Sequence, residues 1–155
     1  MYDLKKHLAE LGAANWSEWK ASLANDVVYE EIATHTRAKG PEEYLKTVQR
    51  WKRAFPDMKA TVLDTFASGE MIVAEVEWEG THTGALDGPF GSIAPTGKRG
   101  LLKASMVARV RDDKLVELHH YFDMVTMLAN LGIAPFAGVG AQPAKSAAVQ
   151  ANPSR

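Results

Sequence analysis

The chain has 155 residues, with 18 Lys and Arg against 19 Asp and Glu, and it contains no cysteine. This length fits one domain that can bury a core without help from disulfides or metals. The net charge of -1, without a basic run, argues against a nucleic-acid partner. A disulfide, a thiolate zinc site and a cysteine nucleophile are all excluded.

The two ends of the chain lead to different expectations. The N-terminal residues lack the apolar core and cleavage site of a signal peptide, and no stretch is as long as a membrane span. We therefore expect a soluble, cytoplasmic protein without a membrane partner. Residues 137–155 are small and polar without periodicity, which predicts a tail that is flexible or ordered by a partner. Residues 1–136 are expected to form a single domain.

Helical periodicity dominates the beginning of the chain. Apolar residues recur at helical spacing over 2–23, although Gly12 and Asn15 weaken the middle. The Asn-Asp pair at 25–26 predicts a turn, and the β-branched and aromatic residues of 27–33 predict a strand.

A second helix is expected over 40–55. Pro41 stands in its first turn, where the missing N–H costs least, and Pro56 ends it. After Pro56 the apolar period changes from about 3.6 to 2. The alternation predicts strands over 58–69, 70–84, 100–110 and 114–123, followed by a short helix over 124–132.

The segment 85–100 is rich in Gly and Pro, which predicts a loop able to cover the mouth of a cavity. Two helices with a strand between them, followed by a curved antiparallel sheet, define an α+β arrangement with the helices on one face. Such a sheet can wrap around the helices and leave a cone-shaped space.

The last strand has two unlike faces. One face collects four titratable side chains, which are Glu117, His119, Tyr121 and Asp123. The other face carries Val116, Leu118, His120 and Phe122, which suits a convex face or a subunit interface. The titratable face is either the wet face of a half-buried sheet or the wall of a pocket, and the alternation leaves both open.

Three separated motifs occur in the order typical of one family. They are AFPDMKATVLDTFASGEMIVAEVEWEGTHTG (54–84), APTGKRG (94–100) and DKLVELHHYFDMVTMLANLG (113–132). Over about residues 1–133 the chain resembles the SnoaL-like polyketide cyclase and ester cyclase family, within the nuclear-transport-factor-like cone fold that includes ketosteroid isomerases. Here Ala94 replaces the first Pro of a PPTG turn and Asn130 replaces a Gln.

The resemblance implies a cone-shaped α+β barrel, and it places Asp123 with the last-strand acid that such cyclases use to move a proton. Burial in an apolar cone would raise the pKa of this carboxyl group and make it a proton shuttle. The alternative is that Asp123 is the N-cap of the following helix.

His82 lies in GTHTG on the apolar side of its strand. A neutral imidazole there can polarise a carbonyl or position Asp123, or it can instead be a structural histidine of the glycine-rich turn. Tyr121 could hydrogen-bond an enolate and His119 could relay protons, although each is also an ordinary residue type for a pocket rim.

Further residues are candidates for binding a ligand. Tyr29, Glu31 and His35 flank the first strand, near where related proteins line the mouth of the cone. Trp51 and Trp78 are expected in the core or the cavity wall. No histidine pair has the spacing of a zinc-binding helix, so we expect no metal.

The sequence leads to three functional hypotheses. The first is an enzyme without a cofactor that deprotonates a carbon next to a carbonyl, as in polyketide-type aldol cyclisation or ketosteroid-type isomerisation of a small apolar or polycyclic ligand. The second is a binding protein for an apolar ligand. The third is a hydrolase or dehydratase, which requires a second polar cluster deep in the pocket. By analogy we expect a homodimer or higher homo-oligomer.

Overall fold

The structure is a computed structural model that describes residues 1–89 and 91–133, and the expected tail at 137–155 lies outside them. Its helices are α1 (Leu4–Gly12), α2 (Trp16–Ala21), α3 (Gly40–Ala54) and α4 (Met124–Asn130), with a 3-10 turn η1 (Ile32–Thr34). The strands of the main sheet are β1 (Leu23–Glu31), β2 (Thr36–Lys39), β3 (Lys59–Ser68), β4 (Met71–Thr81), β7 (Arg99–Arg111) and β8 (Lys114–Phe122). Strands β5 (Leu86–Gly88) and β6 (Gly91–Ile93) form a separate small hairpin.

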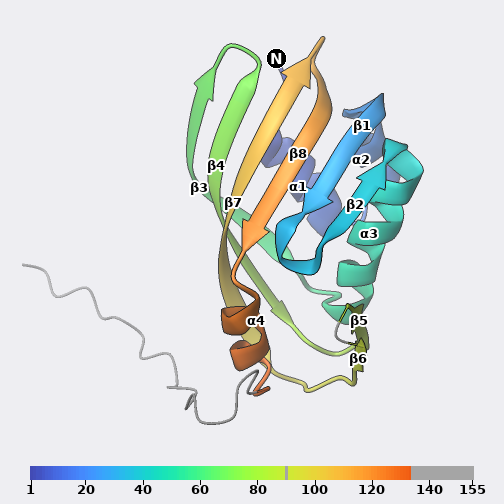
Figure 1. Ribbon diagram of the computed structural model, residues 1–155, viewed down its shortest axis with the longest axis vertical. Helices are drawn as coiled ribbons and strands as arrows, with labels where there is room; N and C mark the ends of the chain where they lie inside the picture. Colours follow the sequence, from blue (N-terminus) through green and yellow to red (C-terminus); the bar gives the residue numbers. More distant parts are fainter. Residues whose placement is uncertain (90, 134–155) are drawn as a thin grey trace, which may run out of the picture.

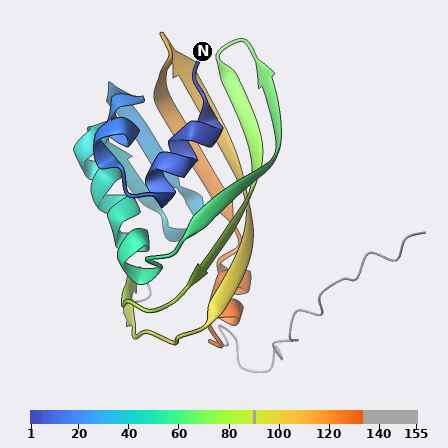
Figure 2. The same cartoon turned by 180° about the vertical axis from the view of Figure 1, so that it is seen from behind.

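The main sheet has the order β2-β1-β8-β7-β4-β3. Strands β1 and β8 pair in parallel, and the other neighbours are antiparallel. The sheet curves around α1, α2 and α3, which cover its concave face (Figure 1, Figure 2). The expected α+β class and cone are therefore confirmed.

The beginning of the chain differs from the sequence prediction in three places. The helical stripe over 2–23 is interrupted after Gly12, where Ala14 adopts a left-handed φ of 56°, so two helices form. The expected turn at 25–26 is instead an exposed part of β1, where the pairing with β8 is irregular. The edge strand β2 was not predicted, because its four residues are too few and too polar to show alternation.

The segment 85–100 is also more regular than expected. It contains the β5–β6 hairpin, and Leu86 packs in a second apolar cluster with Ala54 of α3 and Leu128 of α4. None of its described residues before Gly100 lines the pocket, so the predicted cover over the cavity mouth is not found.

Strand β8 contains a bulge close to its start. The pairing with β7 shifts register between Leu115 and Glu117, which leaves Val116 as an extra residue. Leu115 and Leu118 are both fully buried as a result. From Leu118 onward the even-numbered side chains face the helices, so Leu118 and Phe122 do not form the expected outer apolar face.

Candidate active site

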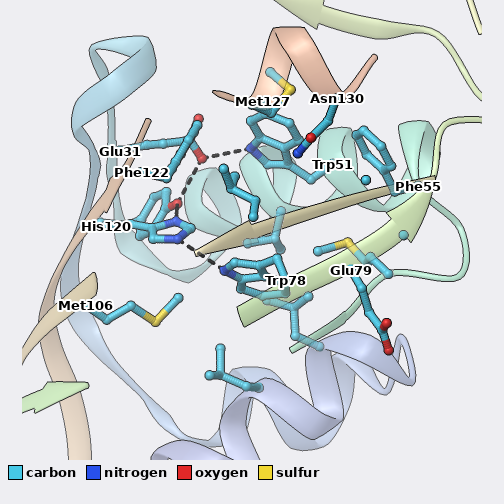
Figure 3. A pocket seen from close by; sticks show the side chains of 18 of the residues that line it. Glu31, Trp51, Phe55, Trp78, Glu79, Met106, His120, Phe122, Met127 and Asn130 are labelled. Atoms are coloured by element: carbon cyan, nitrogen blue, oxygen red, sulfur yellow. Dashed lines mark hydrogen bonds between the residues drawn. The ribbon is translucent and has the colours of Figure 1, made fainter. Parts of the chain in front are cut away.

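A pocket of about 100 Å³ lies between the concave face of the sheet and the helices. Aromatic rings form much of its wall, namely Tyr44, Trp51, Phe55, Trp78 and Phe122. The polar lining side chains include Tyr29, Glu31, His120 and Asn130 (Figure 3). A mostly apolar cavity with a few convergent polar groups is the usual form of a small-molecule site.

Secondary-structure periodicity brings these side chains together. Val48, Trp51 and Phe55 are spaced three and four residues apart on α3, so they share the face of the helix that lines the pocket. Tyr29 and Glu31 alternate on β1, and both point inward. Trp78 of β4 and His120 of β8 complete the wall from the sheet side.

A chain of hydrogen bonds joins four of the lining side chains. The Tyr29 hydroxyl donates to Glu31 Oε2 at 2.9 Å and lies 3.0 Å from His120 Nδ1. On the other side of the imidazole ring, Trp78 Nε1–H donates to His120 Nε2 at 3.3 Å. Figure 3 shows the chain running across the pocket from Glu31 to Trp78.

Glu31 is fully buried, and four donors surround its carboxylate. Oε1 accepts from Thr34 Oγ1–H at 2.5 Å and from Arg50 Nη2–H at 2.9 Å. Oε2 accepts from Trp51 Nε1–H at 2.8 Å as well as from Tyr29. A carboxylate that only accepts, next to a guanidinium, is the arrangement that an ionised buried acid requires.

These contacts define the proton positions around His120. Because the Tyr29 hydrogen points at Glu31, the Tyr29 oxygen must accept from His120 Nδ1–H. His120 Nε2 then carries the lone pair, which agrees with its acceptance of the Trp78 N–H. The imidazole therefore presents its basic nitrogen beside an indole donor.

Burial controls the ionisation of this cluster. Desolvation lowers the pKa of His120 to about 4, although the Glu31 charge acts in the opposite direction. Desolvation also raises the pKa of Tyr29 well above its ordinary value. His120 and Tyr29 are thus neutral at pH 7.

Four of the expected ligand-binding residues line this pocket, which are Tyr29, Glu31, Trp51 and Trp78. His35 does not. It is exposed after η1 with a left-handed φ of 54°, in the connection between β1 and β2.

His119 and Tyr121 lie on the outer face of β8, opposite to the side expected for a pocket wall. His119 Nε2 lies 3.2 Å from Glu117 Oε1 and 3.8 Å from Glu30 Oε2. Tyr121 is 42% exposed. The titratable face of the strand is therefore the outer face of the sheet.

Asp123 is also outside the pocket, in the place that the capping interpretation predicts. Its Oδ1 accepts from Val125 N–H at 3.0 Å and its Oδ2 from Thr126 Oγ1–H at 2.5 Å. The hydrogen bond from Thr126 and those from the backbone lower the pKa of Asp123, whereas a buried proton shuttle requires a raised one. The expected apolar environment of this carboxyl group is not found.

His82 is fully buried on the apolar side of its strand, as the alternation predicted, but it lies against Phe55 and not in the pocket lining. Its Nδ1 accepts from Thr96 N–H at 3.2 Å, and its backbone bonds to Gly97 and Lys98. Burial lowers its pKa. These contacts join the GTHTG motif to the APTG turn, which fits the structural alternative.

His120 lines the pocket, although the strand pattern predicted that it would lie on the convex face or at a subunit interface. That prediction took the titratable face of the strand as the side of the pocket and set aside the neighbours of His120 on the opposite face. The signal was present in those neighbours, since Leu118 and Phe122 on the same face are apolar, and an apolar strand face is normally the buried one.

Within residues 1–89 and 91–133, no cluster of three or more His, Asp or Glu side chains could hold a metal ion. No helix in the same part of the chain is long and apolar enough to cross a membrane.

The fold and this pocket define a cone-shaped α+β protein with an apolar pocket between its sheet and its helices. The sequence profile of the SnoaL-like polyketide cyclase family matches residues 4–131, so the chain belongs to that family. No protein with a curated function matches the sequence significantly.

Solved structures of the same fold agree with this assignment. IdmH of Streptomyces antibioticus, a proposed polyketide cyclase, is 28% identical, with a TM-score of 0.69 over 81% of this chain and 93% of IdmH. AclR of Streptomyces galilaeus, a proposed hydroxylase, is 22% identical, with a TM-score of 0.70 over 84% of this chain and 82% of AclR. A ketosteroid-isomerase-like protein of Catenulispora acidiphila is 17% identical, with a TM-score of 0.69 over 81% of this chain and 88% of its own. The last two support the fold alone.

Proposed function

We propose that this protein is a cofactor-independent enzyme that removes a proton from a carbon next to a carbonyl group, with His120 as the general base. The observation that carries the proposal is the basic Nε2 of His120 in an apolar pocket, with Nδ1–H held by Tyr29 and, through it, by Glu31. This base replaces Asp123, which the sequence analysis placed in that role. Aldol cyclisation or double-bond isomerisation of a small apolar ketone would follow from the enolate.

The hydrogen-bond chain explains how a buried imidazole could accept a proton. When Nε2 takes the proton, the imidazolium donates to Tyr29, whose hydroxyl donates to the Glu31 carboxylate. The negative charge of Glu31 stabilises the new positive charge through this link. Arg50 keeps the resting site neutral by pairing with Glu31 at 2.9 Å.

In this proposal the indole N–H of Trp78 stabilises the negative charge of the enolate. Trp78 Nε1 donates to His120 Nε2 at 3.3 Å in the structure, and a bound ketone would accept this N–H in place of Nε2, which frees the lone pair of Nε2 for the proton. The α-hydrogen and the carbonyl oxygen of a ketone are close neighbours, so a bound ketone can place one at His120 and the other at Trp78. A preorganised donor in a dry pocket stabilises such an oxyanion strongly.

The lowered pKa of His120, about 4, limits the substrates that it can deprotonate. A weak base removes a proton efficiently only from an activated carbon. We therefore expect a C–H group placed between two activating groups, such as two carbonyls or a carbonyl and an aromatic ring.

The test is hydrogen–deuterium exchange of 2-tetralone in D₂O, followed by proton NMR at the carbon between its ring and its carbonyl. The wild-type chain is expected to exceed the buffer rate. His120→Gln should lower the excess rate by about 100-fold or more, the usual contribution of a general base. His119→Gln, on the outer face of the same strand, is the matched control and should retain it.

Exchange that survives in His120→Gln would refute His120 as the base. No exchange above buffer, combined with quenching of Trp51 and Trp78 fluorescence by 2-tetralone, would instead support a binding protein. Both indoles line the pocket, so their fluorescence reports its occupancy.

One observation favours dehydration as a second candidate function. The hydrolase or dehydratase hypothesis required a second polar cluster deep in the pocket, besides Asp123 and His82. Glu31, Tyr29 and His120 form a polar cluster there, although Asp123 and His82 lie outside the pocket lining. His120 could take the α-proton of a β-hydroxy ketone and return it to the leaving hydroxyl group, which releases water. Conversion of 3-hydroxy-1-tetralone to 1-naphthol and water, measured by naphthol fluorescence above the buffer rate, tests this reaction.

We also propose that the protein forms a homodimer, through the outer face of β3 and β4. Phe66 of β3 is 71% exposed and pairs with Val73 of β4, which is 40% exposed. Sedimentation of wild type and Phe66→Lys at micromolar concentration tests the proposal, because the charge should shift a dimer to a monomer.

A further inference from the structure

Helix α4 supplies one wall of the pocket, and Asp123 is its N-cap. Met127, Asn130 and Leu131 all line the cavity (Figure 3). The helix has only seven residues. Isolated helices of this length are unstable, so its position depends on its contacts at both ends and on packing.

Both carboxylate oxygens of Asp123 are used by the first turn of α4. Oδ1 accepts the backbone N–H of Val125, and Oδ2 accepts the hydroxyl of Thr126. The backbone carbonyl of Asp123 accepts from Met127 N–H at 3.0 Å. Met127 is itself a lining residue, so the cap is directly connected to the wall of the pocket.

The far end of α4 is anchored differently. Asn130 Nδ2–H donates to the carbonyl oxygen of Leu101 at 2.8 Å, and Leu128 and Leu131 pack in the second apolar cluster. Gly132 then ends the helix with a left-handed φ of 75°. The first turn is held by Asp123 and by Met124, which packs against the same cluster from a partly buried position, while Val125 is exposed there.

We propose that Asp123 is a positioning residue: it caps α4, holds Met127 and Asn130 in the pocket wall, and exchanges no proton with the substrate. The inference rests on the proposed function only where it refers to catalysis, because the effect on ligand binding is independent of the chemistry. Any loss of activity when Asp123 is replaced would then come from a displaced α4 and not from a lost proton carrier.

The surroundings of Asp123 support this separation. The residue borders an outer groove that also includes Tyr121, Lys103 and Ser105, on the far side of the sheet from His120. The carboxylate is already occupied by two donors from α4. The pKa of Asp123 is lowered by these hydrogen bonds, in agreement with a permanently ionised cap.

The test compares Asp123→Ala with Asp123→Asn and Asp123→Ser. Asn and Ser cap helices nearly as well as Asp, whereas Ala does not. The probe is 2-tetralone, with affinity measured by tryptophan quenching and turnover by deuterium exchange. We expect Asp123→Ala to weaken binding by about 2- to 30-fold, the range that corresponds to the loss of a cap. Asn and Ser should stay within about 3-fold of wild type.

Turnover separates positioning from proton transfer. In the Asn and Ser variants the exchange rate at saturating 2-tetralone and its pH profile should match those of wild type, while Asp123→Ala changes mainly the half-saturating concentration. Thr126→Val removes one of the two donors and should give a smaller loss of affinity than Asp123→Ala. If Asp123→Ala does not fold, the affinity of Thr126→Val for 2-tetralone serves as the test instead.

Two results would overturn the inference. One is loss of exchange in Asp123→Asn with 2-tetralone affinity retained, which would make Asp123 a proton carrier. The other is wild-type affinity in both Asp123→Ala and Thr126→Val. If the wild-type chain shows no exchange at all, the proposed function fails, but the binding comparison still decides the role of Asp123.

Discussion

Two buried histidines, His7 and His120, each contact one indole N–H and one hydroxyl group. His7 Nε2 accepts from Trp19 Nε1–H at 3.1 Å, and His120 Nε2 accepts from Trp78 Nε1–H at 3.3 Å. Each Nδ1 contacts a hydroxyl group, that of Ser22 at 2.8 Å for His7 and that of Tyr29 at 3.0 Å for His120. Burial lowers the pKa of both, to about 3 for His7 and about 4 for His120.

The two sites differ in what lies beyond these shared contacts. The Ser22 hydroxyl donates to the neutral carbonyl of Trp19, whereas the Tyr29 hydroxyl donates to the charged carboxylate of Glu31. His120 also lines the pocket, and His7 does not. A buried, hydrogen-bonded histidine is therefore no sign of a site by itself. A buried charge behind it and access to a cavity distinguish a candidate base from a structural residue.

The largest expected effect comes from the charge that only the His120 site has. Glu31→Gln leaves Arg50 without its partner in a mostly buried position, and breaking such a pair costs about 3–5 kcal/mol. Chemical denaturation should show this loss of unfolding free energy. The control Glu79→Gln, whose partner Arg99 is exposed, should cost less than about 1 kcal/mol. Equal losses in the two variants would contradict the prediction that the buried Glu31–Arg50 pair contributes more to stability than an exposed pair.

The next prediction removes the hydroxyl group from each site. Tyr29→Phe disconnects His120 from Glu31 and should lower 2-tetralone exchange by about 10- to 100-fold, in the range of a hydrogen bond to a charged group. Ser22→Ala is the matched change at His7 and should leave exchange unaffected while lowering stability by about 1–3 kcal/mol. A loss of exchange in Ser22→Ala would show that the two sites are not separate.

The pH dependence of stability should depend on both histidines, whereas the pH dependence of exchange should depend on one. The pKa values of about 3 and about 4 are below the ordinary 6.5. Between these folded values and pH 6.5 the unfolded chain therefore binds more protons than the folded chain. Stability should be complete above about pH 6.5 and fall as the pH falls below it, by up to about 1.4 kcal/mol per pH unit for each histidine. His7→Gln should reduce this slope in denaturation series measured between pH 4 and 7.

Exchange should follow His120 alone. Because the base must be neutral, the exchange rate per active site should stay high near pH 7 and fall as the pH passes below about 4. His7→Gln should leave that profile unchanged. A midpoint that moves in His7→Gln would contradict the assignment.

The smallest effect is expected at His119, the neighbour of His120 on the opposite face. His119→Gln should change stability by less than about 0.5 kcal/mol, because its partners Glu117 and Glu30 are partly exposed. A thermal melt beside wild type measures the difference. A larger loss would indicate that the outer face of β8 is more than solvated surface.

Much of the fold could be predicted from the sequence, because it depends on periodicity. The alternation in β4 correctly placed Ala74, Val76 and Trp78 toward the inside, and the motifs correctly indicated the family. The short edge strand β2 could not be recognised in this way. Its four residues owe their extended conformation to pairing with β1.

The site was only partly predictable, for a physical reason. Alternation divides a strand such as β8 into two faces, but which face is inside depends on the elements packed against it. Tyr29 and Glu31 were proposed from the resemblance to related cone proteins, and Trp51 and Trp78 were expected in the core or the cavity wall. All four line the pocket. His120 was missed because titratable side chains were taken as the mark of a pocket.

The bulge at Val116 explains how β8 directs His120, and not His119, toward the pocket. In an uninterrupted strand Leu115 and Glu117 would share a side, so burying the first would bury the second. The extra residue resets the phase of the strand, which lets Leu115 and Leu118 both face inward while Glu117 stays outside. The number of residues at this point is therefore under stricter constraint than their identity. Replacing the Val116 side chain should be tolerated. Deleting the residue would either shift the pairing of β7 with β8 or turn His120 away from the pocket.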